Sequence, residues 1–131
     1  MDAGRLAKLP LFGELDAHDL GHLAGWLRDV ELAPGDVLIR QGAMPDDVFV
    51  LESGSVEVTR DGERLATLGA GEVVGEIALV DPQRRTATVQ AATPVHAVAL
   101  NVRDLPEMAS EMPEIVRQLR VIAERRLAEQ R

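Results

Sequence analysis

The residues best suited to chemistry in this sequence lie between Gly71 and Val89, where an acid, an arginine and several small residues stand close together. Gly75 and Glu76 begin a stretch that reads as one helical turn, and Arg85 follows Glu76 by nine residues. A helix start offers unpaired backbone amides and a partial positive charge, which suit a phosphate group. A guanidinium adds a rigid fork of donors for the same anion. The spacing therefore predicts a cradle that binds an anion.

The charge of the chain makes a local positive site necessary for any anionic ligand. The net charge is −8, and residues 1–102 hold 8 Lys and Arg against 16 Asp and Glu, whereas residues 103–131 hold 6 of each sign. An acidic body repels nucleic-acid phosphates, so DNA and RNA are not expected as partners. A small anion would need a preorganised cation, and Arg85 lies in the segment that can supply it.

Size and composition predict one globular domain at 1–131, because 131 residues can bury a single core. The apolar residues never run long enough to cross a bilayer, and the first residues lack the pattern of a secretory signal. We therefore expect a cytoplasmic domain without a membrane segment. The absence of cysteine excludes disulfides, thiolate catalysis and zinc–thiolate sites. We expect no metal and no cofactor.

The middle of the chain, residues 29–100, has the period-two pattern of strands. Asp61 and Gly62 form a hairpin signal between two of these strands. Closely spaced strands divided by glycine and proline indicate a small antiparallel sandwich or barrel. The expected strands are 30–32, 37–40, 48–51, 55–60, 64–68, 87–92 and 95–100.

Helices are predicted on both sides of the strands, in residues 1–28 and 101–131. Residues 5–12 suggest a short helix, and Asp16 is a candidate cap for a second one that runs through Leu27. Asn101 is a candidate cap for a helix over 102–110, and a further helix begins at Pro113. This last helix has one apolar stripe, which can pack on the strands or on a second subunit. Its members are Ile115, Val116, Leu119, Ile122, Ala123 and Leu127.

Residues 71–89 resemble the phosphate-binding cassette of cyclic nucleotide-binding domains. In that cassette a Gly-Glu-[Leu/Ile]-Ala-Leu turn is followed nine positions after its acid by an arginine, a small residue, alanine and serine or threonine. This sequence matches each position. Pro34-Gly35-Asp36 and Ser53-Gly54-Ser55 also look like the family's early strands. The resemblance implies a mostly β fold with flanking helices: an antiparallel β-barrel or jelly roll (double-stranded β-helix), N-terminal helices, a short cassette helix and C-terminal helices.

The resemblance also implies a role for each residue of the cassette. Glu76 would accept a hydrogen bond from a ribose 2′-hydroxyl, and Arg85 would pair with the cyclic phosphate. The Thr86 hydroxyl favours cyclic GMP slightly, although family members with Thr or Ser there also bind cyclic AMP. Two residues of the last helix are candidates for a lid. The expected ligand-binding residues are Val74, Gly75, Glu76, Ile77, Ala78, Arg85, Thr86, Ala87, Arg126 and Leu127.

The resulting hypothesis is a binding and sensor module, not an enzyme, for a 3′,5′-cyclic mononucleotide, with cAMP favoured over cGMP. The ligand would move the cassette and the C-terminal helices and so signal to an unidentified effector protein or domain. A homodimer through the last helix is a second use of its apolar stripe. Two alternatives stay open: a structural domain of the same fold that binds no nucleotide, and a cupin-type metal enzyme. The enzyme would need clustered histidine and carboxylate ligands near the strands, whereas two of the three histidines, His18 and His22, lie on a predicted helix and the third is His96.

Overall fold

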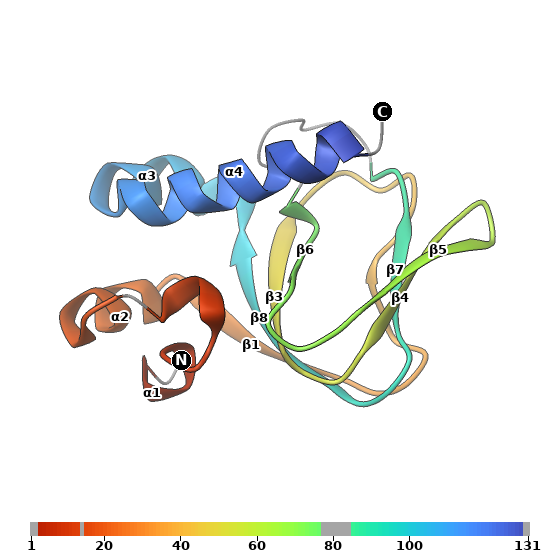
Figure 1. The fold of residues 1–131 in the computed structure, drawn as a ribbon, viewed down its shortest axis with the longest axis horizontal. Helices are drawn as coiled ribbons and strands as arrows, with labels where there is room; N and C mark the ends of the chain where they lie inside the picture. The colour runs from red at the N-terminus through yellow and green to blue at the C-terminus, as the bar shows by residue number, and fades with distance from the viewer. Residues whose placement is uncertain (1–2, 14, 77–84, 130–131) are drawn as a thin grey trace.

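The computed structural model describes residues 3–13, 15–76 and 85–129, and it contains two four-stranded antiparallel sheets with helices on one side (Figure 1). The helices gather beside the first sheet, and the second sheet lies on the far side of the molecule. This arrangement confirms the predicted mostly β jelly-roll class. The helical segments are α1 (Ala3–Leu6), the 3-10 turn η1 (Pro10–Phe12), α2 (Ala17–Ala24), the 3-10 turn η3 (Val102–Asp104), α3 (Leu105–Glu111) and α4 (Pro113–Glu129).

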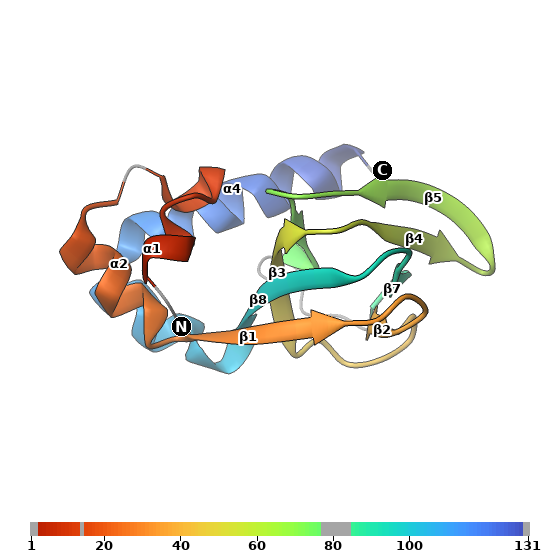
Figure 2. The same cartoon turned by 90° about the horizontal axis from the view of Figure 1, so that it is seen from below.

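The strands divide between the sheets in the orders β1-β8-β3-β6 and β2-β7-β4-β5. Figure 2 shows β1, β8 and β3 side by side along one face of the molecule. The short strand β6 extends the first sheet by pairing with β3, and it lies near the start of the cassette. The strands are β1 (Leu27–Leu32), β2 (Val37–Ile39), β3 (Asp47–Ser53), β4 (Val56–Arg60), β5 (Glu63–Leu68), β6 (Val73–Val74), β7 (Thr88–Ala91) and β8 (Val95–Asn101).

The inner strands β3 and β8 of the first sheet are buried on both faces, which explains the unbroken apolar run in β3. Val48 and Val50 face the helices, whereas Phe49 and Leu51 face the second sheet. Successive side chains of a strand point to opposite faces, so such a run can serve two cores at once. The helix-side core joins this face to the four helices. Its helical members are Leu6, Leu20, Leu23, Ala24, Leu105, Met108, Ile115, Val116 and Leu119.

Local signals predicted several boundaries correctly. The Asp16 side chain accepts a hydrogen bond from the Asp19 amide at 2.8 Å and caps α2, as expected. The Asn101 side chain likewise accepts from the Arg103 amide at 2.9 Å. Asp61 and Gly62 both have positive φ, 53° and 82°, as a tight hairpin turn requires.

Other boundaries were predicted wrongly. The helix that Asp16 begins ends at Ala24, because the Gly25 amide donates back to His22 and Leu23, and Leu27 instead pairs with Leu100 in the sheet. The expected helix over 102–110 is divided into a 3-10 turn and an α-helix.

The short helix expected over residues 5–12 is also divided. The chain forms α1 and then η1, because Pro10 begins a separate 3-10 turn.

Candidate functional site

The turn of the cassette that follows β6 begins with a glycine that no other residue could replace without strain. Gly75 follows β6 with a φ of +83°, in the left-handed region that side chains disfavour. A Cβ at this position would lie 2.8 Å from Ile39 Cδ1, 3.1 Å from Arg85 Nη1 and 3.2 Å from the Asp47 carbonyl oxygen. The backbone is therefore folded tightly against the side chain of Arg85.

Arg85 is held in place by the backbone around it. Its Nη1 donates to the Gly75 carbonyl at 2.9 Å, its Nη2 donates to the Asp47 carbonyl, and the Asp46 carboxylate lies 3.7 Å away. The backbone amide of Arg85 donates to the Ala43 carbonyl at 2.7 Å. The side chain is 8% exposed, and burial lowers the pKa of Arg85, although a guanidinium keeps its charge in proteins. The cation is thus desolvated and fixed in orientation.

Glu76 is a buried carboxylate next to this cation. It is 2% exposed, and its Oε1 lies 2.8 Å from Nη1 of Arg126, which reaches it from the last turns of α4. The same nitrogen donates to the Val73 carbonyl at 2.7 Å. Burial raises the pKa of Glu76, while the charges of Arg126 and Arg85 act in the opposite direction. In Figure 1, α4 passes across the top of the molecule over β6, where these residues meet.

The structure therefore brings together the part of the predicted site that carries charge. Gly75, Glu76, Arg85 and Arg126 meet at the end of β6, where Val74 is buried. Of the other described candidates, Thr86 is exposed, and Ala87 and Leu127 are half-buried. Ile77 and Ala78, together with most of the expected cassette helix, lie outside the described residues.

Sequence reasoning missed the partners that hold the two charged side chains. The Asp47 carbonyl lies 38 positions from Arg85, and Arg126 lies 50 positions from Glu76. An ordinary strand start and an arginine-rich helix end give no local signal for either contact.

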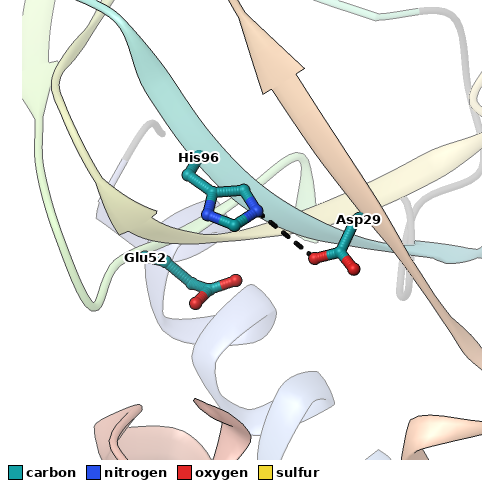
Figure 3. A group of neighbouring side chains, drawn as sticks. All are labelled: Asp29, Glu52 and His96. Carbon is teal, nitrogen blue, oxygen red and sulfur yellow. Dashed lines mark ion pairs between the residues drawn. The ribbon is translucent and has the colours of Figure 1, made fainter. Parts of the chain in front are cut away.

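A second cluster of ionisable groups bears on the metal-enzyme alternative. Asp29, Glu52 and His96 offer ligand atoms within 4.8 Å of one another, and Figure 3 shows the three side chains converging. Arg5 already inserts among them: its Nη2 lies 2.8 Å from Asp29 Oδ1, 2.6 Å from Glu52 Oε1 and 2.8 Å from His96 Nε2. These contacts anchor α1 to strands β1, β3 and β8.

His18 and His22 are exposed on α2, apart from the strands on which a cupin-type centre would be built. The His22 ring lies 3.4 Å from the Glu111 carboxylate of α3 instead. The described arrangement therefore gives the metal-enzyme alternative no assembled centre of three histidines.

Comparison with known proteins shows the family to which this chain belongs. The model of the cyclic nucleotide-binding domain family matches residues 29–112, which include most of β1, the strands β2 to β8 and α3. The chain belongs to the cyclic nucleotide-binding domain family. Such domains are regulatory modules that bind a ligand. Among the described residues, no helix has both the length and the apolar character needed to cross a membrane.

Members of the family occur in several kinds of larger protein. A cyclic nucleotide-gated potassium channel of Rhizobium etli is 36% identical over 118 residues, which cover 90% of this chain and 33% of that protein. The catabolite activator protein of Thermus thermophilus has a TM-score of 0.80 at 27% identity, covering 92% of this chain and 59% of that one. The regulatory subunit of a cAMP-independent protein kinase A from Trypanosoma brucei has a TM-score of 0.79 at 26% identity, covering 92% and 44%. The chain spans about a third or less of the channel relatives that it matches.

Proposed function

We propose that this cyclic nucleotide-binding domain binds a 3′,5′-cyclic mononucleotide at the end of β6 and signals its presence through α4. The observation that carries the proposal is that Arg85 contacts Gly75, the residue before the buried Glu76, and that the backbone of this glycine leaves no room for a side chain. A cation and an acceptor that both lie beside this glycine suit a ligand that carries a phosphate and a ribose hydroxyl close together. A sulfate or free phosphate would make no use of Glu76.

Arg85 supplies the charge that the phosphate needs. Its guanidinium is desolvated and oriented by two backbone carbonyls, and a charge in such surroundings acts more strongly than one in water. The body of the protein is acidic, with a net charge of −8, so an anion gains little from the rest of the surface. Amides near Ile77, Ala78, Thr86 and Ala87 would complete the cradle, and small side chains there would let the ligand approach.

Glu76 supplies the feature that separates a nucleotide from other phosphates. Its carboxylate would accept a hydrogen bond from the ribose 2′-hydroxyl, and a hydrogen bond to a charged group contributes about 1.5–3 kcal/mol. For the base we favour adenine over guanine. Thr86 is exposed and can offer its hydroxyl to a guanine amino group. This contact makes cyclic GMP the second candidate ligand.

Family membership leaves the ligand itself to be tested, because the trypanosomal relative is described as cAMP-independent. A member that had lost binding would be expected to lose the cassette acid or arginine, and this chain keeps both.

The signalling step is also part of this proposal. Because α4 contacts the site through Arg126, movement of the cassette would reach the C-terminal helix and an effector beyond it. A cytoplasmic location, the absence of enzymatic activity and dimerisation through α4 stay predictions from the sequence.

Thermal unfolding in the presence of cyclic AMP, cyclic GMP and linear 5′-AMP tests this function. A ligand at 100 times its dissociation constant adds about 2.7 kcal/mol to the free energy of unfolding. We expect both cyclic nucleotides to raise the melting temperature, cyclic AMP at the lower concentration, and 5′-AMP to have much less effect. If no cyclic nucleotide changes the melting temperature at millimolar concentration, the domain is a member of the fold that does not bind them.

A further inference from the structure

Arg126 contacts the carboxylate that is expected to meet the ribose. It lies near the end of α4, and its Nη1 reaches both Glu76 Oε1, at 2.8 Å, and the Val73 carbonyl, at 2.7 Å. Its side chain is 30% exposed, against 3% for that of Glu76, so the carboxylate is closed off while part of the arginine still meets solvent. This contact differs from the role of a lid over the base, in which the guanidinium would lie against the ligand itself.

The contact solves a physical problem that Glu76 creates. A buried carboxylate without a partner loses its hydration and tends to take up a proton. A protonated Glu76 would be a weaker acceptor for a hydroxyl group, because hydrogen bonds to charged groups are the stronger ones. Arg126 lowers the pKa that burial raises, and so favours the charged form.

The contact also fixes the direction of the carboxylate. Arg126 is itself tied to the backbone of β6, which is paired with β3, so it presents its donor from a rigid element. A carboxylate accepts about four hydrogen bonds through its two oxygens, so the ion pair and a ribose hydroxyl do not exclude each other.

We propose that Arg126 is a positioning residue: it holds Glu76 charged and oriented so that the carboxylate can accept the 2′-hydroxyl of the ligand's ribose. The ribose preference of the site then depends on α4 being docked, although no atom of α4 needs to touch the nucleotide. This inference rests on the proposed function, and it names the part of the ligand that α4 recognises indirectly.

Calorimetric titration with cyclic AMP and 2′-deoxy cyclic AMP separates this role from that of a lid. The variant Arg126→Met keeps the long apolar stem and removes the charge, and Arg125→Met on the exposed neighbouring position is the matched control. We expect Arg126→Met to weaken cyclic AMP binding about tenfold, or about 1.4 kcal/mol. Binding of 2′-deoxy cyclic AMP should not change, Arg126→Lys should recover part of the loss, and Arg125→Met should bind as the wild type does.

A double-mutant cycle adds an independent reading. If Arg126 acts through Glu76, then Arg126→Met combined with Glu76→Gln should weaken cyclic AMP binding no further than Glu76→Gln alone. An equal loss of affinity for both nucleotides in Arg126→Met would show direct contact with the base or phosphate and would overturn the inference. Additive losses in the cycle would overturn it as well.

A measurement without nucleotide keeps this inference distinguishable from the proposed function. The Glu76 carboxyl can be titrated by carbon NMR, and its pKa should be higher in Arg126→Met than in the wild type. An unchanged pKa would overturn the claim that Arg126 holds the charge. If instead the pKa rises while the wild type binds no cyclic nucleotide, the ion pair has the assigned effect on Glu76 and the proposed function is what fails.

Discussion

Replacing Gly75 by alanine should damage both the fold and the site, and the two costs can be separated. The φ of +83° costs an L-residue about 1–2 kcal/mol, since its Cβ crowds the backbone. The new Cβ would also lie 2.8 Å from the end of Ile39 and 3.1 Å from Arg85 Nη1. Overpacking of this kind costs about 1–3 kcal/mol in addition. Ile39 can move its terminal methyl group, but Arg85 is held by two carbonyls, so even a small shift of its guanidinium would disturb these hydrogen bonds.

Gly62→Ala is the matched control for the backbone cost. Gly62 has a φ of +82° in the β4–β5 hairpin, and none of the described atoms lies within 4 Å of where its Cβ would be. Chemical denaturation should therefore show that Gly75→Ala is less stable than Gly62→Ala by about 1–3 kcal/mol. Calorimetry should show at least about a tenfold loss of cyclic AMP affinity for Gly75→Ala, equivalent to 1.4 kcal/mol, and none for Gly62→Ala. Equal stabilities and equal affinities of the two variants would refute the reasoning.

Three further changes test other parts of the structure. Gly54→Ala should destabilise the fold by more than about 3 kcal/mol, because its Cβ would lie 2.1 Å from the Pro94 carbonyl oxygen; thermal and chemical unfolding would measure this. Asp16→Ala should cost about 0.5–2 kcal/mol by removing the cap of α2, measured by urea denaturation. The folded state binds the proton of Glu76 more tightly than the unfolded chain does, since its pKa is raised. The stability of the wild type relative to Glu76→Gln should therefore fall as pH rises above about 4.3, and level off above the folded-state pKa.

Each of these predictions has a result that would contradict it. A Gly54→Ala variant as stable as the wild type would show that the strand ends can separate at little cost. An unchanged Asp16→Ala variant would mean that water replaces the cap. A stability difference between the wild type and Glu76→Gln that does not vary between pH 4 and pH 7, or that grows with pH, would show that burial does not govern the Glu76 carboxyl.

The meeting of Arg85 with Gly75 could be predicted from the sequence because the two residues are close together in the chain. Gly75, Glu76 and Arg85 lie within eleven residues, and each has a residue type that its position requires. The caps at Asp16 and Asn101 were equally local, since each side chain accepts from an amide two or three positions away. The end of α2 was missed because apolar spacing continued to Leu27, whereas the pairing of Leu27 with Leu100 depends on residues far along the chain.

The sequence could not predict the contacts that hold the site together. Arg126 reaches Glu76 because α4 packs on the helix-side core, and this packing depends on apolar residues from all parts of the chain. Arg5 meets Glu52 across 47 positions for the same reason. A motif can name the groups that meet a ligand, but the charges that set their pKa and orientation are determined by the tertiary fold.

The central claim is that Arg85 binds the phosphate of a cyclic nucleotide, and calorimetric titration of the wild type and Arg85→Ala tests it most directly. Cyclic AMP, cyclic GMP and a cyclic dinucleotide would be titrated in parallel, with Arg125→Met as a control for the loss of one positive charge. We predict that one cyclic mononucleotide binds per chain, and that Arg85→Ala weakens binding by about 2–5 kcal/mol while Arg125→Met does not. Unchanged affinity in Arg85→Ala, or no binding by the wild type, would contradict the account.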